Sequence, residues 1–120
     1  MAPVYRHPRT DEIQLHEVFR ALGDPIRLNI AAILLSLDET PCAPLAIRLG
    51  IADSTLSYHL RQLREAGITR TRPDGVQRRM SLRREDLNER FPGFVDWLER
   101  TLAGRPGAWP AAPRADSGAV

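Results

Sequence analysis

The sequence predicts a mostly α-helical fold with one β-hairpin, arranged as a winged helix-turn-helix. Two amphipathic helical stretches, about 43–49 and 52–67, are separated by a short turn after Gly50, which is helix-turn-helix spacing. An alternating stretch follows, with the turn residues RPDG at its centre, as is typical of a hairpin or wing. Further amphipathic helices precede and follow this unit, so its apolar faces can be covered.

Length and composition favour a single globular domain. The chain has 120 residues, of which 42% are hydrophobic and 27% charged, enough to bury one modest core. No apolar run reaches about 18 residues, and the stretch MAPVYRHPRT lacks an apolar segment, so we expect no membrane span and no secretory signal. The single cysteine, Cys42, excludes an internal disulfide and favours a reducing cytoplasm.

The positive charge is concentrated in one short block. Every basic residue except the histidines is an arginine, and residues 61–84 contain eight arginines against two acidic residues. Residues 1–60 and 85–120 each carry a net charge of −2. A focused basic patch on a nearly neutral chain predicts a polyanionic partner such as double-stranded DNA. An arginine-rich surface that contacts only solvent would have the same charge distribution and is the alternative.

The helices before the basic block are predicted from apolar periodicity and capping residues. Residues 1–10 show no periodicity and are expected to form a disordered arm, and residues 12–22 form an amphipathic helix. Asp24 is a suitable N-cap and Pro25 fits the first turn of the next helix. That helix, which continues to about residue 37, is apolar on several sides and is expected at the centre of the domain.

The elements after the turn follow from alternation and from one proline. Residues 68–72 and 76–82 are predicted strands, with Arg70, Arg72, Gln77 and Arg79 pointing away from the core. Residues 84–103 are helical, and Pro92 is expected to kink or divide that helix. Residues 104–120, rich in proline, glycine and alanine, are expected to be a disordered tail.

The helical stretch 52–67 separates an apolar stripe from a polar face. At 100° per residue the leucines fall on one side. The opposite face carries hydrogen-bonding side chains of mixed kind: Ser54, Thr55, Ser57, Tyr58 and Arg61. Such a face suits a helix that reads base edges in the major groove. His59 lies at the boundary, where DNA contact and packing beside the core are both open, and Asp53 is interpreted chiefly as a helix cap.

Three stretches in order resemble the ArsR family of bacterial winged helix-turn-helix repressors. They are FRALGDPIRLNIAAIL, LAIRLGIADSTLSYHLRQLREAGI and RTRPDGVQRRMSLR, and the resemblance spans roughly residues 12–103. It implies a homodimer formed by the first and last helices, binding to an imperfect inverted repeat, and release by an inducer. Ala52 and Asp53 replace the serine and glutamine usual in the family, so the family's base preference does not transfer.

The resemblance assigns residues to two surfaces. It places residues 11–103 in one DNA-binding and dimerisation domain. The DNA-binding set comprises Ser54, Thr55, Ser57, Tyr58 and His59 in the groove, Arg61 beside it, and Arg72, Gln77, Arg78 and Arg79 on the wing. The candidate dimer contacts are Leu15, Val18, Phe19, Phe94, Trp97, Leu98 and Leu102.

The sequence favours no metal ion and no other cofactor. Pro41 and Ala43 stand where arsenic-sensing relatives carry two cysteines, and the last helix holds no histidine for a zinc site. A site that uses His7 and His16 stays open as an alternative. Cys42 could act as a redox switch if its place before a helix lowered its pKa. By elimination, an inducer would be a small organic molecule near the dimer interface, and constitutive binding that is controlled only by expression level is the open alternative.

Two other function classes remain for comparison. The chain has no glycine-rich phosphate loop and no nucleophile motif, so an enzyme is not expected. Ser57 and His59 are two residues apart on a helix and therefore do not face each other. A dimeric protein-binding module that uses the same fold without reading DNA is the remaining alternative, and the carboxylates Asp53 and Glu65 are its support.

Overall fold

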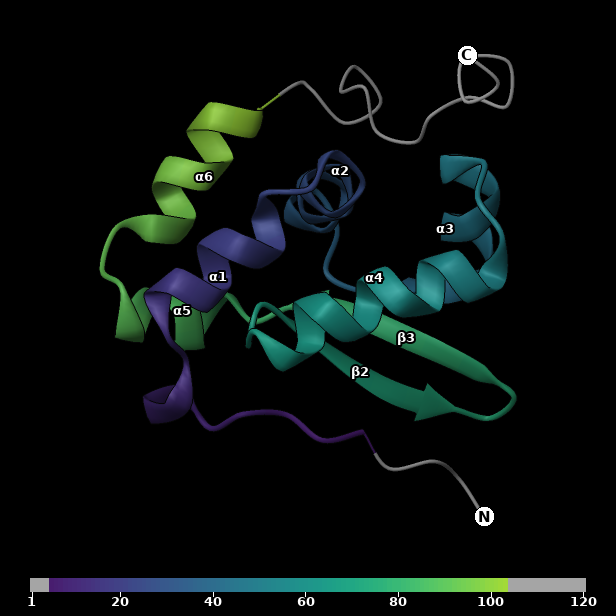
Figure 1. The fold of residues 1–120 in the computed structure, drawn as a ribbon, viewed down its shortest axis with the longest axis horizontal. Coiled ribbons are helices and arrows are strands. Elements are labelled where there is room, and N and C mark those ends of the chain that lie inside the picture. Colours follow the sequence, from purple (N-terminus) through teal and green to yellow (C-terminus); the bar gives the residue numbers. More distant parts are fainter. Residues whose placement is uncertain (1–4, 104–120) are drawn as a thin grey trace.

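The computed structural model describes residues 5–103, and it has the predicted winged helix-turn-helix fold (Figure 1). Its elements are η1 Thr10–Glu12, α1 Leu15–Leu22, α2 Pro25–Leu35, β1 Thr40–Pro41, α3 Cys42–Leu49, α4 Asp53–Glu65, β2 Thr69–Asp74, β3 Gln77–Leu82, α5 Arg84–Arg90 and α6 Phe94–Leu102. The expected tail at 104–120 and the first four residues of the expected arm lie outside the described residues. No helix within residues 5–103 is long and apolar enough to cross a membrane.

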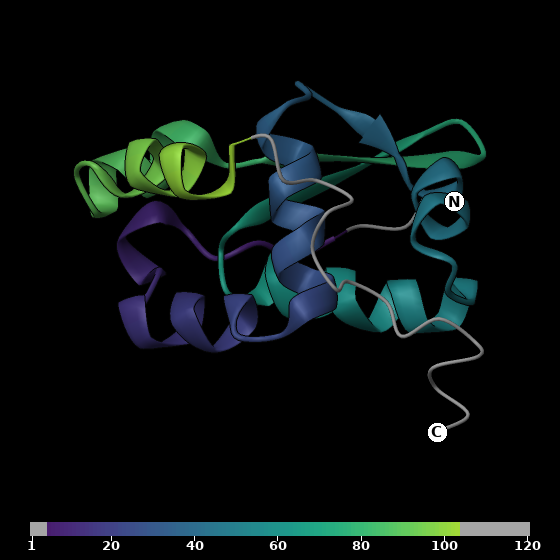
Figure 2. The same cartoon turned by 90° about the horizontal axis from the view of Figure 1, so that it is seen from above.

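Helix α2 lies at the centre of the domain, as its apolar composition predicts. Figure 2 shows α1 and α4 along one side and the sheet, α5 and α6 along the other, with α2 crossing between them. Seven of its eleven residues are buried. The Asp24 carboxylate accepts hydrogen bonds from the backbone N–H groups of Ile26 and Arg27, at 2.9 and 3.1 Å, so the predicted cap is confirmed.

Of two further predictions about helix boundaries, one is confirmed and the other is wrong. The predicted division at Pro92 is confirmed, because α5 ends at Arg90 and α6 begins at Phe94. The cap interpretation of Asp53 is wrong. Ala52 occupies the N-cap position of α4, and no side chain caps that end. Asp53 is instead the first helical residue, where its negative charge still complements the helix dipole.

The sheet has three antiparallel strands in the order β1-β3-β2. The hairpin turn consists of Gly75 and Val76, so Pro73 and Asp74 belong to β2 rather than to the turn. Strand β1 was not predicted, because a two-residue strand that contains a proline has no period. Alternation gives the sheet a core face and an outer face. The buried Thr69, Thr71, Met80 and Leu82 face the core, and Arg70, Arg72 and Arg79 lie on the outer face.

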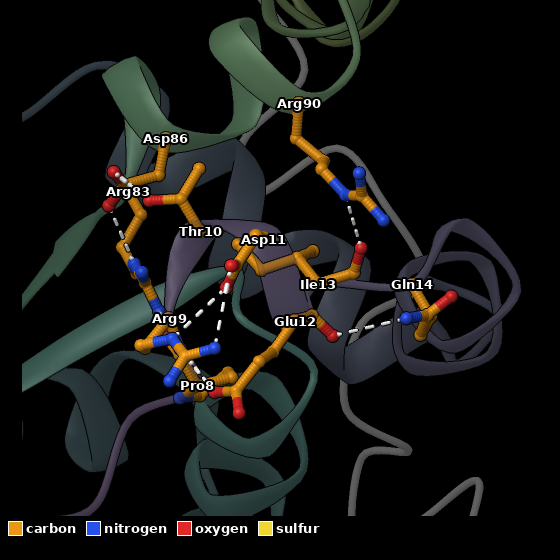
Figure 3. Close-up of polar contacts among 10 residues, drawn as sticks. All are labelled: Pro8, Arg9, Thr10, Asp11, Glu12, Ile13, Gln14, Arg83, Asp86 and Arg90. Carbon is orange, nitrogen blue, oxygen red and sulfur yellow. Dashed lines mark hydrogen bonds and ion pairs between the residues drawn. The ribbon is translucent and has the colours of Figure 1, made fainter.

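Residues 5–10 dock on the domain, so the expectation of a disordered arm is wrong for this part. The backbone N–H of Thr71 donates a hydrogen bond to His7 Nε2 at 3.0 Å. The guanidinium of Arg83 donates to the carbonyl oxygen of Pro8 at 2.7 Å. The Thr10 hydroxyl donates to Asp86 at 2.7 Å (Figure 3). These are long-range contacts, which local sequence pattern does not encode.

Candidate nucleic-acid interface

Helix α4 exposes the polar face that the sequence predicted. Its leucine stripe is buried, with Leu56, Leu60 and Leu63 at most 2% exposed. The opposite face is open to solvent: Ser54, Thr55, Tyr58 and Arg61 are exposed, and Ser57 is partly buried. Because the helix begins directly after a short turn from α3, these side chains form the outer surface of the helix-turn-helix unit.

His59 is not on that exposed face, which corrects its place among the groove residues. The residue is only 7% exposed. Its Nδ1 atom lies 3.0 Å from the Arg27 guanidinium and 3.9 Å from the Asp24 carboxylate. Burial, followed by the repulsion of Arg27, lowers the pKa of His59, although Asp24 opposes this shift. His59 therefore connects α4 to the start of α2, which was the alternative that the sequence left open.

The wing residues divide between the two faces of the hairpin. Arg78 lies on the side of α4, where its Nη2 atom is 3.4 Å from the Ser57 hydroxyl. On the outer face, Arg72 donates two hydrogen bonds to Glu39, at 2.7 and 2.8 Å, and Arg79 donates one to Asp74 at 2.7 Å. The arginines that are predicted to contact phosphates therefore differ in their present partners. Arg72 and Arg79 are bonded to carboxylates, whereas Arg78 contacts a hydroxyl group.

A cleft separates the hairpin from the helix-turn-helix unit. It is lined by Cys42, Ala43, Asp53, Leu56, Val76, Gln77 and Arg78. Gln77 and Arg78 belong to the wing and the others to α3, α4 and the turn of the hairpin. Helix α4 and the hairpin are thus neighbours, joined at this cleft by the Arg78–Ser57 contact.

Part of the basic block stabilises the fold instead of facing a partner. Arg83 is 5% exposed and bonds both Asp86 and the Pro8 carbonyl oxygen. Arg84 donates to the carbonyl oxygen of Leu34, at the end of α2, at 3.3 Å. A count of arginines in the sequence contains no information about these partners, so it overestimates the charge that is available to DNA.

The surroundings of Cys42 and His7 differ from those that the two sensor hypotheses require. Cys42 is 5% exposed, and this burial raises the pKa of its thiol, contrary to the lowered value expected for a helix start. Nε2 of His7 accepts the Thr71 N–H and is not available to a metal. Among residues 5–103 no group of three histidine, cysteine or carboxylate side chains is arranged to hold a metal ion.

The candidate dimer residues separate into an exposed group and a buried group. Leu15, Phe19 and Trp97 are 42%, 54% and 51% exposed. With Phe94 they line a shallow apolar hollow, together with Phe91, Pro92 and Gly93, which the sequence argument missed. The rings of Phe19 and Phe94 pack edge to face, with 6.2 Å between the ring centroids. The ring of Phe94 stacks on that of Trp97, with a centroid distance of 6.3 Å.

The other three candidates belong to the core of the protomer, and their assignment to the dimer interface is wrong. Val18, Leu98 and Leu102 are at most 3% exposed. They lie on the inner faces of α1 and α6, which hold these helices against the domain. Apolar periodicity identified which face of each helix is apolar. It did not show which residues of that face are buried within the protomer and which remain exposed at its edge, because that depends on tertiary packing.

The chain is similar to known transcriptional regulators. Residues 22–72 match a family described as a helix-turn-helix domain. The HTH-type transcriptional regulator YceK of Bacillus subtilis is 39% identical over 83 residues, which cover 68% of this chain and 83% of that protein. An HTH-type transcriptional regulator of Mycobacterium tuberculosis is 32% identical over 89 residues, or 74% of this chain and 78% of that protein.

Solved structures give the same result. HlyU from Vibrio cholerae matches with a TM-score of 0.61 and 27% identity, covering 72% of this chain and 88% of that chain. The transcriptional repressor BigR from Xylella fastidiosa matches with a TM-score of 0.57 and 26% identity, covering 75% and 87%. Fold, motif order and relatives agree: the chain belongs to the ArsR family of winged helix-turn-helix, DNA-binding transcriptional regulators.

Proposed function

We propose that the chain acts in the cytoplasm as a homodimeric repressor, which binds an inverted-repeat operator in double-stranded DNA and is released by a small organic inducer. The observation that carries the proposal is the exposed face of α4, where Ser54, Thr55 and Tyr58 lie beside Ser57 and its wing neighbour Arg78. Short side chains that donate and accept hydrogen bonds discriminate base edges, whereas arginines bind phosphates.

The basic residues supply affinity in this proposal. Arg61 on α4 and Arg78 on β3 bind the DNA backbone, with Gln77 beside them. Arg72 and Arg79 reach phosphates by leaving their carboxylate partners. Such an exchange is feasible because exposed ion pairs contribute little to stability. His59 has no part in the contact, since it is buried.

The apolar hollow on α1 and α6 supports the proposed dimer. Leu15, Phe19, Phe94 and Trp97 are the contacts proposed to meet their counterparts across a two-fold axis. A two-fold axis presents two α4 helices in opposite orientation, which matches an inverted repeat. The margin of this hollow is also the proposed site for an apolar organic inducer, because a ligand there changes the relative position of the two α4 helices.

The test is selection of genomic DNA fragments by the purified protein, followed by sequencing of those retained. We expect an enriched inverted repeat. Ser57→Ala should change the enriched sequence, and Arg61→Ala should weaken binding to all sequences and reduce the slope of log affinity against log salt by about one. Arg9→Ala removes an exposed arginine outside this interface and serves as the control. A folded dimer that enriches no sequence would overturn the proposal.

A further inference from the structure

The N-terminal segment, residues 5–10, occupies the outer edge of the wing strand β2. The strand order β1-β3-β2 leaves that edge without a strand partner among residues 5–103. The N–H of Thr71 points to this edge and donates to His7 Nε2 at 3.0 Å. One imidazole thus satisfies a backbone group that an edge strand otherwise leaves open.

The same segment is anchored to three other parts of the domain. The Pro8 carbonyl oxygen accepts from Arg83 just after β3, and the Thr10 hydroxyl donates to Asp86 on α5 (Figure 3). Arg83 also bonds Asp86, at 2.9 Å. On the other side, the guanidinium of Arg64 on α4 lies 5.1 Å from the centre of the Tyr5 ring. The segment therefore contacts α4, β2 and α5 at once.

We propose that His7 is a positioning residue for DNA binding, which fixes the base of the wing at Thr71 relative to α4. The inference rests on the proposed function, because it concerns how well the wing and α4 fit DNA together. Strands β2 and β3 run from the end of the molecule that holds α5 to the hairpin turn, on the side of α3 and α4 (Figure 1). A small rotation at Thr71 displaces the tip at Gly75 and Val76, so an unfixed base lowers affinity by adding an ordering cost on binding.

The hydrogen bond requires a neutral imidazole. A doubly protonated histidine has no acceptor nitrogen, so protonation removes the bond to Thr71. Burial and three arginines, Arg83, Arg70 and Arg64, lower the pKa of His7, and a backbone hydrogen bond with Tyr5 opposes the shift. Asp86 on α5 forms ion pairs with two of these arginines, Arg83 and Arg70. At neutral pH His7 is therefore in the form that accepts.

The experiment compares the wild-type chain with two variants on one selected operator fragment. Affinity is measured by fluorescence anisotropy at fixed ionic strength, at about pH 7.5 and about pH 5, on either side of the histidine range. His7→Gln keeps an acceptor that does not titrate, and His7→Ala removes the acceptor. His16→Gln, an exposed position on α1, controls for the loss of a histidine elsewhere.

At about pH 7.5 we expect wild type and His7→Gln to bind alike and His7→Ala to bind about fivefold more weakly. At about pH 5 the wild type should bind more weakly than His7→Gln, by up to the same factor, and His16→Gln should follow the wild type. Comparison at equal pH removes the effect of other titrating groups. A merely structural role would not produce this difference between wild type and His7→Gln.

Three results overturn the inference: equal affinity of all variants at both pH values, failure of His7→Gln to restore the affinity lost in His7→Ala, or identical pH profiles of wild type and His7→Gln. Circular dichroism at each pH reports folding. If His7→Ala does not fold, the comparison of wild type with His7→Gln still decides the question. Absence of wild-type binding to any selected fragment at about pH 7.5 would instead remove the proposed function.

Discussion

Arg72 and Glu39 form a two-point ion pair on the outer face of the sheet, with N–O distances of 2.7 and 2.8 Å. Arg72 lies directly opposite Arg79 in the register of β2 and β3, which places two positive charges side by side. Glu39 and Asp74 offset this repulsion, and Arg72 in turn lowers the pKa of the Glu39 carboxyl group through its hydrogen bonds. In the free protein the outer face of the wing is thus nearly neutral.

Substitution of Glu39 by glutamine should tighten DNA binding. Without its carboxylate partner, Arg72 is available to a phosphate, so we expect affinity for all DNA sequences to rise by about fivefold. The slope of log affinity against log salt should steepen by about one. Asp11→Asn removes the same charge from an exposed ion pair between η1 and Arg9 and should change neither quantity. Weaker binding by Glu39→Gln would mean that Glu39 orients Arg72 instead of competing with DNA.

A charged residue in the apolar hollow should separate the proposed dimer. Trp97→Asp places a carboxylate among Phe19, Phe94 and Leu15, where a partner subunit would have to desolvate it. Sedimentation velocity should then show a monomer, and operator affinity should fall by more than tenfold because one half-site contact is lost. Ile47→Asp is the matched control, since Ile47 is 82% exposed but lies on α3. A dimeric Trp97→Asp would place the interface elsewhere.

Acid should destabilise the fold through His59. Burial holds the pKa of His59 in the folded chain below 6.5, its ordinary value, so the unfolded chain takes up the proton first as the pH falls. The free energy of unfolding should therefore decrease as the pH drops through about 6.5 and further toward the folded-state pKa. Urea denaturation of wild type and His59→Gln at several pH values measures this, and the variant should show the shallower dependence. His16→Gln, on the exposed side of α1, should retain the wild-type dependence.

Two glycines with positive φ should respond differently to alanine. Gly67 follows α4 with φ +87°, and an added Cβ would lie 2.6 Å from Cγ1 of Ile13. Gly50 has φ +69°, and an added Cβ there meets nothing within 4 Å. We expect Gly50→Ala to cost about 1 kcal/mol for the left-handed conformation, and Gly67→Ala to cost about 1–3 kcal/mol more for the overlap. Equal melting temperatures of the two variants would contradict the packing argument.

The elements of the DNA-binding unit were predictable because they depend on local pattern. The leucine stripe of α4, the glycine after α3 and the turn-forming stretch after β2 all act over a few residues. The polar face of α4 follows from the same periodicity, since burying one side of a helix exposes the other. The short strand β1 lacked any such signal, because it exists only through its pairing with β3.

The roles of single residues at the interface depended on distant partners. His59 and Tyr58 are adjacent in sequence, yet His59 packs against Arg27 and Tyr58 is exposed. Arg72 and Arg78 both count as wing charges, yet one contacts Glu39 and the other Ser57. Periodicity gives the approximate direction of a side chain around the helix axis. For a residue between the buried and the exposed face, that direction does not decide whether the side chain is buried.

The sequence by itself determined the family, the order of the main helices and of the two hairpin strands, and the exposed polar face of α4. Short-range apolar periodicity and turn chemistry carry that information. The tertiary structure decided which arginines are engaged by carboxylates, which apolar residues of α1 and α6 stay exposed, and that His7 attaches the N-terminal segment to the wing. These are contacts between residues dozens of positions apart, and they exist only once the chain has packed.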